Sequence, residues 1–446
     1  MNSILISGGT LLPMTEGAPR QRPGDVWIRD GRIAAVGEVP EEAREATRLD
    51  ATGCAVLPGF VQTHLHLVQT LFRGEAEGLS LLPWLRTRIW PLEAAHDEES
   101  LRASARLGLF GCIESGATTL FDMGTTHGHG VVLEEIAASG IRAWSGKALM
   151  DLDLDGSTPT RLRETTERAL SEAAELARQF DGAASGRVRY AYAPRFALSA
   201  TPDLHQEVAR LAQRHDRRVH THASETPSEV DACRRHFGNP CVAHLSRVGL
   251  GTGRWTLAHC VHLEPNEVEV LAATRTGVAH CPSSNLKLGS GIADVVRMRL
   301  HRISVGLGSD GAPCNNRLDF FREMSLASLL PRRLGDAVGL DAWTTLTLAT
   351  REGAAAIGMD QEIGTLEIGK RADVVIIDLC TPNTTPHREV ATAIVHGASP
   401  SQVRDVLVDG LFLKRNFQVL GYDARELCAR GELALESLLS RAALAG

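Results

Sequence analysis

Residues 58–66 read PGFVQTHLH, an apolar run that ends in two histidines separated by one residue. In a β-strand, residues two positions apart point to the same face, so His64 and His66 can direct both imidazoles at one ion. Imidazole nitrogen is a common protein ligand of Zn²⁺. An H-x-H pair alone is a weak signal, because two unrelated histidines give the same pattern, and the remaining ligands must come from elsewhere in the chain.

On the C-terminal side of this stretch, apolar strand-like runs alternate with helix-like segments as far as about residue 357. The strand-like runs are residues 117–121, 143–149, 188–193, 218–222, 256–259, 277–280 and 305–308. This number of strand-helix units favours an α/β fold, a parallel (β/α)8 TIM barrel, over an open doubly wound sheet. In such a barrel the C-terminal ends of the strands carry the chemistry.

The two ends of the chain have a different pattern, in which short β-branched runs are joined by tight turns such as Asp30-Gly31 and Asp409-Gly410. Near the C-terminus the strand-like runs are residues 372–379, 391–396 and 403–408. We therefore expect residues 1–57 and 361–420 to form one small composite β-sandwich domain. We expect residues 58–360 to form the catalytic barrel and residues 421–446 to form a closing helix.

A second histidine pair lies in residues 220–225, which read HTHASE. His220 and His222 share a strand face, and Glu225 falls in the loop above the strand end. A carboxylate beside an activated water is the expected general acid and base, since it can take a proton from water and pass it to a leaving amine. The alternative reading of Glu225 is an acid in the first turn of a solvated helix.

Two more strand-like runs end in polar residues. Residues 257–262 read LAHCVH and place His259 at a strand end, where it can polarise water or substrate or, alternatively, be a hydrogen-bonded core histidine. Residues 306–311 read GLGSDG, and Asp310 is either a metal ligand and catalytic base or a turn-forming residue. Three histidines and one carboxylate suit one divalent ion, with Zn²⁺ favoured over Fe²⁺ or Mn²⁺.

These motifs together resemble the amidohydrolase superfamily, and within it the aminohydrolase group that includes deaminases of purines and hydrolases of triazines. The matching segments are PGFVQTHLHLVQTLFRG from residue 58, HTHASE from 220, AHCVHL from 258, HCPSSNLKLGSGIA from 280, GLGSDGAPCNN from 306 and GTLEIGKRADVVIID from 364. The resemblance implies that His64, His66, His222 and Asp310 bind one zinc ion. It also implies that Glu225 is the proton shuttle and that His259 stands beside the metal.

The resemblance also suggests substrate-binding residues. Glu93 falls where deaminases of methylthioadenosine and S-adenosylhomocysteine carry a glutamate that accepts ribose hydroxyls, and Glu225 would also contact the substrate. These enzymes and 5′-deoxyadenosine deaminases are the leading assignment. Gln69 and the Pro194-Arg195-Phe196 segment instead resemble guanine deaminases, and Arg195 offers donors for a carbonyl oxygen. The simpler readings are a salt bridge for Arg195 and a helix-start acid for Glu93.

Three alternatives to an adenosine-type deaminase therefore stay open: a guanine or 8-oxoguanine deaminase, an s-triazine hydrolase that removes chloride or an amine, and a non-catalytic barrel scaffold. The net charge of −7 and the even scatter of Lys and Arg argue against nucleic acid as a partner. No signal-like or membrane-spanning run is found at the N-terminus, so we expect a cytoplasmic protein that does not insert in membranes. Relatives lead us to expect a homo-oligomer acting on a small purine-type molecule.

Overall fold

The computed structural model describes residues 3–251, 253–335 and 339–444. Its central feature is a sheet of eight parallel strands in the order β10-β8-β7-β6-β15-β14-β13-β12. A parallel bridge between Tyr192 and Val219 joins the two outer strands, so the sheet closes into a barrel. The barrel strands are β6 (Phe60–Leu65), β7 (Ala117–Met123), β8 (Arg142–Gly146), β10 (Val188–Tyr190), β12 (Val219–Ala223), β13 (Trp255–His259), β14 (Gly277–His280) and β15 (Val305–Leu307). The predicted TIM barrel is confirmed.

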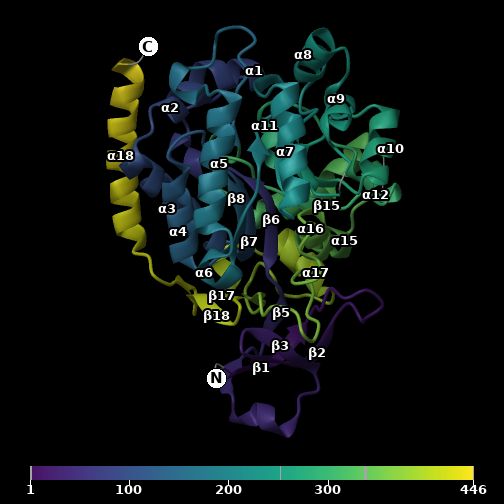
Figure 1. Ribbon diagram of the computed structural model, residues 1–446. Coiled ribbons are helices and arrows are strands. Elements are labelled where there is room, and N and C mark those ends of the chain that lie inside the picture. The colour runs from purple at the N-terminus through teal and green to yellow at the C-terminus, as the bar shows by residue number, and fades with distance from the viewer. Residues whose placement is uncertain (1–2, 252, 336–338, 445–446) are drawn as a thin grey trace.

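Helices surround this barrel in Figure 1. The longer ones are α3 (Glu98–Glu114), α4 (His129–Ser139), α5 (Thr166–Phe180), α7 (Pro202–Arg214), α8 (Pro227–Phe237), α9 (Cys241–Val248), α10 (Pro265–Ala273), α14 (Phe320–Leu329) and α15 (Ala342–Ala349). Shorter segments near the strand ends are α1 (Leu81–Trp84), the π-helical turn η3 (Leu85–Ile89), α2 (Trp90–Ala94), α11 (Pro282–Lys287) and α13 (Ala312–Asn315). The remaining short helices include α12 (Val295–Leu300) and α16 (Arg351–Ala356).

Both ends of the chain contribute to a second sheet, of nine strands, which forms the small domain below the barrel in Figure 1. Its path is β19-β18-β17-β16-β5-β1-β2-β3, with β4 paired to β1. These strands are β1 (Ser3–Leu11), β2 (Arg22–Arg29), β3 (Arg32–Gly37), β4 (Thr47–Asp50), β5 (Cys54–Pro58), β16 (Val374–Asp378), β17 (Val403–Val408), β18 (Leu411–Arg415) and β19 (Gln418–Val419). One apolar cluster unites side chains from β1, β2, β3, β5, β16 and β17, so the sheet folds around its own core. The predicted small domain from both ends is confirmed, and its exact limits stay a prediction.

The prediction of a strand at residues 391–396 is wrong. Residues 391–396 belong to two helical turns, α17 (Val390–Thr392) and η7 (Ala393–Gly397). Their buried residues include Val390, Ala391, Ile394 and Val395, which follow the i, i+1, i+4, i+5 spacing of a helix face rather than the alternation of a strand. The β-branched residues therefore favoured a strand, whereas the spacing of the buried apolar residues is that of the helical turns found.

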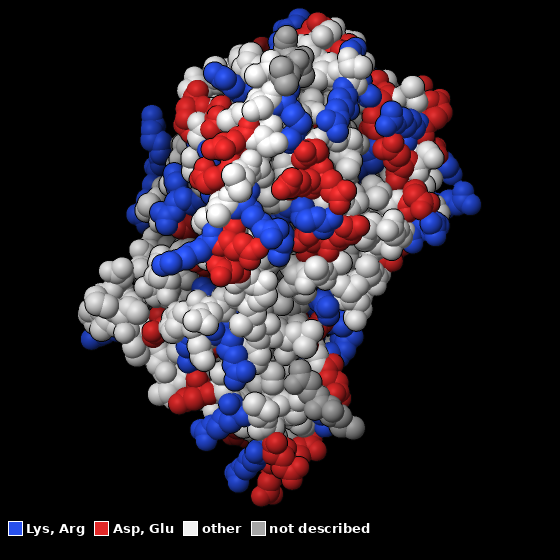
Figure 2. Space-filling view, turned by 90° about the vertical axis from the view of Figure 1, so that its left-hand side faces the viewer, with Lys and Arg blue, Asp and Glu red and all other residues white. Residues whose placement is uncertain are grey.

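The last helix, α18 (Ala424–Leu444), packs beside α3 along one side of the barrel (Figure 1). Figure 2 shows this side of the molecule, where Lys and Arg side chains are interspersed with Asp and Glu side chains. No helix among the described residues is long and apolar enough to cross a membrane.

Arg142 links the barrel to the sheet of the small domain through one fully buried and one partly buried ion pair. Its Nε donates to Asp373 Oδ2 at 2.8 Å, and its Nη2 donates to Asp409 Oδ1 at 2.7 Å. The side chains of Arg142 and Asp373 are 0% and 2% exposed, so water has almost no access to this pair. Asp373 precedes β16 and Asp409 follows β17, which means that the contact ties barrel strand β8 to the C-terminal part of the small domain.

We predict that Arg142→Met lowers the free energy of unfolding by about 3–5 kcal/mol, because it leaves the Asp373 carboxylate buried without its cation. Arg178→Met is the matched control, since Arg178 pairs with Glu175 at the exposed surface of α5 and its loss should leave the denaturation midpoint near that of the wild type. Urea denaturation followed by circular dichroism measures both. Equal denaturation midpoints for the two variants would contradict the structural role given to Arg142.

Candidate metal centre and active site

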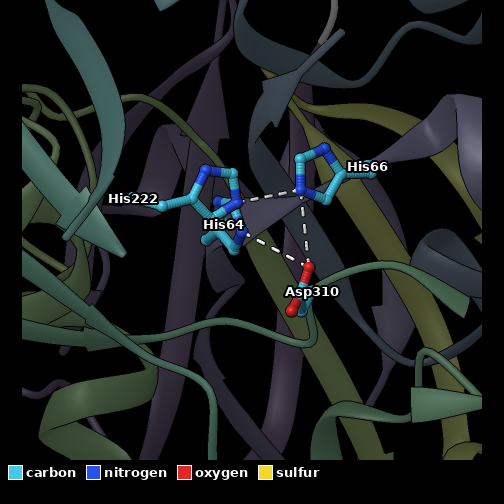
Figure 3. Close-up of side chains that lie close together, drawn as sticks. All are labelled: His64, His66, His222 and Asp310. Atoms are coloured by element: carbon cyan, nitrogen blue, oxygen red, sulfur yellow. Dashed lines mark hydrogen bonds and ion pairs between the residues drawn. The ribbon is translucent and has the colours of Figure 1, made fainter. Parts of the chain in front are cut away.

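The ends of three barrel strands bring four predicted ligands together (Figure 3). His64 lies in β6 and His66 just after it, His222 lies in β12, and Asp310 follows β15. Their ligand atoms all lie within 4.8 Å of one another, so the group could hold one metal ion. His64 and His66 thus point to the same side at the mouth of the barrel, as the strand periodicity predicted.

Backbone hydrogen bonds fix the loop that carries Asp310 against strand β6. The Asp310 N–H donates to the His64 carbonyl at 3.1 Å. The Gln62 side-chain oxygen accepts from the Ser309 N–H at 2.7 Å, and its amide nitrogen donates to the Ser309 hydroxyl at 2.7 Å. The carboxylate and the histidines of β6 are therefore held in a fixed relation before any ion binds.

The tautomers of two histidines follow from their partners. His66 Nδ1 lies 2.8 Å from the Met123 carbonyl, and His222 Nδ1 lies 2.6 Å from the Arg195 carbonyl. A carbonyl oxygen only accepts, so each Nδ1 carries a hydrogen and each Nε2 presents a lone pair. Burial lowers the pKa of His66 to about 3 and that of His222 well below its usual value, so both rings are neutral.

The two Nε2 atoms of His66 and His222 lie only 3.2 Å apart. Two lone pairs facing each other at this distance repel, and a cation bound by both nitrogens removes the repulsion. His64 Nε2 is also buried without a hydrogen-bond partner and lies 3.4 Å from Asp310 Oδ1. Three imidazole nitrogens and one carboxylate oxygen are a donor set that suits Zn²⁺, and the residues present fit such an ion.

Glu225 and His259 lie beside this group, as the sequence led us to expect. His259 Nε2 is 3.6 Å from Glu225 Oε2 and 3.9 Å from Asp310 Oδ2. Asn285 Oδ1 accepts from His259 Nδ1 at 2.9 Å, which leaves Nε2 to face the two carboxylates. Burial raises the pKa of Glu225 to about 7, a value suited to a group that takes up and returns a proton near neutral pH.

The backbone around these side chains is strained. Ser224, His259 and Asp310 have φ angles of 54°, 72° and 60°, in the left-handed region that residues other than glycine seldom adopt. Each such residue costs of order 1–3 kcal/mol and persists only where its surroundings hold it. The three turns lie at the ends of β12, β13 and β15, and they aim the functional side chains into the barrel mouth.

A cavity opens onto three of the four ligands, His66, His222 and Asp310. Its apolar wall comes from Leu81, Trp84, Leu85, Phe196 and Leu288, and its polar lining is formed by His66, Gln69, Arg195, His222, Glu225, Glu229, His259 and Asp310. Leu81 and Trp84 belong to α1, which lies above the barrel strands in Figure 1. The cavity therefore offers a flat apolar molecule a wall to pack on and a reactive end beside the ligand group.

The predicted substrate-binding residues Gln69, Glu93 and Arg195 form one buried network. Arg195 Nη1 and Nη2 donate to the two oxygens of Glu93 at 2.5 and 3.0 Å, and Gln69 Nε2 donates to Glu93 Oε1 at 2.8 Å. Gln69 and Arg195 line the cavity, whereas Glu93 lies behind them with 1% of its surface exposed. The salt bridge considered for Arg195 is present, and the role of Glu93 toward ribose stays a prediction.

Two residues at the site were not singled out from the sequence. Ser290 donates its hydroxyl hydrogen to Glu225 Oε1 at 3.2 Å, and no pattern distinguishes it from other loop serines. Glu229 lines the cavity and accepts a backbone hydrogen bond from Glu225. The Thr226-x-x-Glu229 spacing is a helix-capping signal that could have drawn attention to it.

Comparison with known proteins bears directly on this arrangement. Residues 55–413 match the model of the amidohydrolase family, a span that covers the barrel and the strands β16 and β17. The chain belongs to the amidohydrolase family. The resemblance seen in the sequence motifs is thereby confirmed, and the cluster at the strand ends is the part of this amidohydrolase where its chemistry is expected.

Relatives of this amidohydrolase are similar over nearly their whole length. It is 36% identical to a 5-methylthioadenosine/S-adenosylhomocysteine deaminase of Symbiobacterium thermophilum, over 96% of this chain and 98% of the relative. It is 37% identical to a 5′-deoxyadenosine deaminase of Methanothermobacter thermautotrophicus, over 98% and 99% of the two chains. Among solved structures, an adenosine deaminase from Xanthomonas campestris with bound zinc superposes with a TM-score of 0.91, at 30% identity and 98% coverage of both chains.

We predict that His222→Ala loses its metal, because one of the two facing Nε2 donors is removed. Inductively coupled plasma mass spectrometry of the purified protein should find about one ion per chain in the wild type and a small fraction of that in the variant. His205→Ala is the control, since His205 is a buried histidine on α7 whose Nδ1 hydrogen-bonds the Thr201 carbonyl outside the site. Full metal occupancy in His222→Ala would show that the ligand set is wrong.

Proposed function

We propose that this amidohydrolase is a metal-dependent deaminase that releases ammonia from a purine nucleoside or base. The leading substrate is an adenosine derivative such as 5′-deoxyadenosine, methylthioadenosine or S-adenosylhomocysteine. The observation that carries the proposal is that Glu225 and His259 line one cavity together with three members of the ligand group, His66, His222 and Asp310. The full-length similarity to deaminases of these compounds supports the choice of substrate class.

His64, His66, His222 and Asp310 would hold one divalent ion, Zn²⁺ in preference to Fe²⁺ or Mn²⁺, which when bound acts as a Lewis acid and makes water easier to deprotonate. Glu225 or Asp310 accepts the proton of the attacking water. Glu225 then delivers a proton to the ring nitrogen next to the attacked carbon, and its pKa of about 7 allows both transfers.

His259 acts on the oxygen that is added to the substrate. Nearby carboxylates, Glu225 first, raise the pKa of His259 although burial alone lowers it. A protonated ring would donate from Nε2 toward that oxygen and stabilise the negative charge that develops there. As the tetrahedral carbon collapses, Glu225 takes the proton of the added hydroxyl and passes it to the amino group, which leaves as ammonia, and a ring carbonyl remains.

We predict that Glu225→Gln lowers kcat by about 10²–10⁴-fold, because an amide cannot take up and return the proton. The metal content should stay at the wild-type level, since Glu225 is not one of the four ligands. Glu267→Gln is the control: Glu267 is a buried glutamate on α10 that accepts from the Val242 N–H at 2.9 Å and does not line the cavity. Near-full activity in metal-loaded Glu225→Gln would refute the proton-shuttle role.

A second candidate, a guanine or 8-oxoguanine deaminase, is favoured by the Glu93–Arg195 pair. Both carboxylate oxygens of Glu93 already accept hydrogen bonds, which leaves little capacity for ribose hydroxyls. Arg195 faces the cavity as a donor, and Gln69 Oε1 is a buried acceptor without a partner. A purine base with a carbonyl oxygen and a ring N–H would satisfy both.

Ammonia release by the metal-loaded protein should separate these candidates. The panel is adenosine, 5′-deoxyadenosine, methylthioadenosine, S-adenosylhomocysteine, guanine, 8-oxoguanine and a chloro-s-triazine, and we predict the highest kcat/KM for an adenosine derivative. Preference for guanine or 8-oxoguanine would support the second candidate. Chloride release from the triazine without purine turnover would identify a triazine hydrolase, and no turnover of any compound would leave the non-catalytic scaffold. A homo-oligomeric state and a cytoplasmic location are part of the proposal.

A further inference from the structure

We infer that Glu229 is a positioning residue, which fixes the backbone of Glu225 and thereby aims the Glu225 carboxyl at the ligand group. Its effect on turnover rests on the function proposed above. Glu229 Oε2 accepts from the Glu225 N–H at 2.7 Å, and the Glu229 side chain is nearly fully buried. Glu229 belongs to the first turn of α8, whereas Glu225 lies in the loop between β12 and that helix.

This hydrogen bond differs from the usual helix cap. Thr226 is the N-cap of α8, and its hydroxyl accepts from the Glu229 N–H at 3.2 Å. In a capping box the carboxylate at the third helical position returns to the N–H of the N-cap residue itself. Glu229 instead reaches one residue further back, to Glu225. The side chain therefore holds the loop in front of the helix in addition to starting the helix.

The loop needs such support because it begins with a strained turn. Ser224 has a φ of 54°, and its carbonyl accepts from the N–H groups of Val261 and His262 at 3.0 and 2.9 Å. The loop after β13 thus holds one side of the turn, and Glu229 holds the other side at the next N–H. The Glu225 carboxyl itself has weaker restraints, a 3.2 Å bond from Ser290 and a 3.6 Å approach to His259.

Burial of Glu229 makes a purely structural role expensive. No Lys or Arg forms an ion pair with it in the described residues, and the hydrogen-bond donor to its Oε1 is the Cys241 thiol at 3.6 Å. Burying a carboxylate without a Lys or Arg partner costs free energy, which hydrogen bonds such as the one from the Glu225 N–H offset only in part. Glu229 also lines the same cavity as Glu225 and His259.

Glu267 on α10 provides a matched comparison. It also occupies the third helical position after a proline, and its Oε2 accepts from the N–H of its own N-cap residue, Glu264, at 3.0 Å. Its Oε1 accepts from the Val242 and Ala243 N–H groups, and it does not line the cavity. Removing either glutamate removes buried hydrogen bonds near a helix N-terminus, but only Glu229 hydrogen-bonds to Glu225.

We predict that Glu229→Ala lowers kcat by about 10²-fold through misplacement of Glu225, with KM changed less than threefold and metal content unchanged. Glu229→Gln keeps an oxygen acceptor for the Glu225 N–H and should retain kcat within a few-fold of wild type. Glu229→Asp keeps the charge, but its shorter side chain cannot reach, and it should follow Ala. Glu267→Ala should lower thermal stability without changing kcat.

Hydrogen–deuterium exchange of the peptide containing Glu225 gives a readout that does not depend on turnover. Exchange should be faster in Glu229→Ala and Glu229→Asp than in Glu229→Gln or Glu267→Ala. Wild-type kcat in metal-loaded Glu229→Ala, or equal loss of kcat in the Ala and Gln variants, would overturn the inference. If the wild type turns over no compound of the panel, the proposed function fails, and unchanged exchange at Glu225 in Glu229→Ala would then separately overturn the positioning role.

Discussion

Two neutral imidazole nitrogens held 3.2 Å apart, one on His66 and one on His222, are the constraint on which the site depends. Each ring is fixed by a hydrogen bond from its other nitrogen to a backbone carbonyl, so neither can rotate away. Fixing the outer nitrogen of a metal-binding histidine is a general way to set its tautomer and direction. The backbone carbonyls of β7 and of the segment after β11 (Ala193–Pro194) therefore orient the two ligand histidines.

The barrel makes this arrangement possible because its strands end together. Residues that are distant in sequence, from β6 to the loop after β15, meet at one rim without any segment having to bend far. The left-handed turns at Ser224, His259 and Asp310 then convert strand ends into loops that point side chains inward. The free energy that such turns require is supplied by the well-packed barrel below them, which explains how strained residues can be concentrated at one place.

The sequence predicted the parts of the site that depend on local periodicity. His64 and His66 share a strand face, and Asp310 follows an apolar run, so all three residues could be assigned from spacing and from resemblance. The pairing of Glu93 with Arg195 could not be assigned, because the two residues are 102 positions apart and each has a plausible role of its own. The helical turns at residues 390–397 were missed for a related reason: β-branched composition was given more weight than the spacing of buried residues.

The sheet of the small domain can be completed only late in synthesis of the chain. Strand β5 pairs with β1 on one side and with β16 on the other, and β16 is synthesised only after the entire barrel. At typical rates of translation, an emerging chain would carry an unpaired β5 edge for roughly tens of seconds. Exposed strand edges invite pairing with other chains, so nascent copies on one messenger RNA would be most vulnerable to association during that interval.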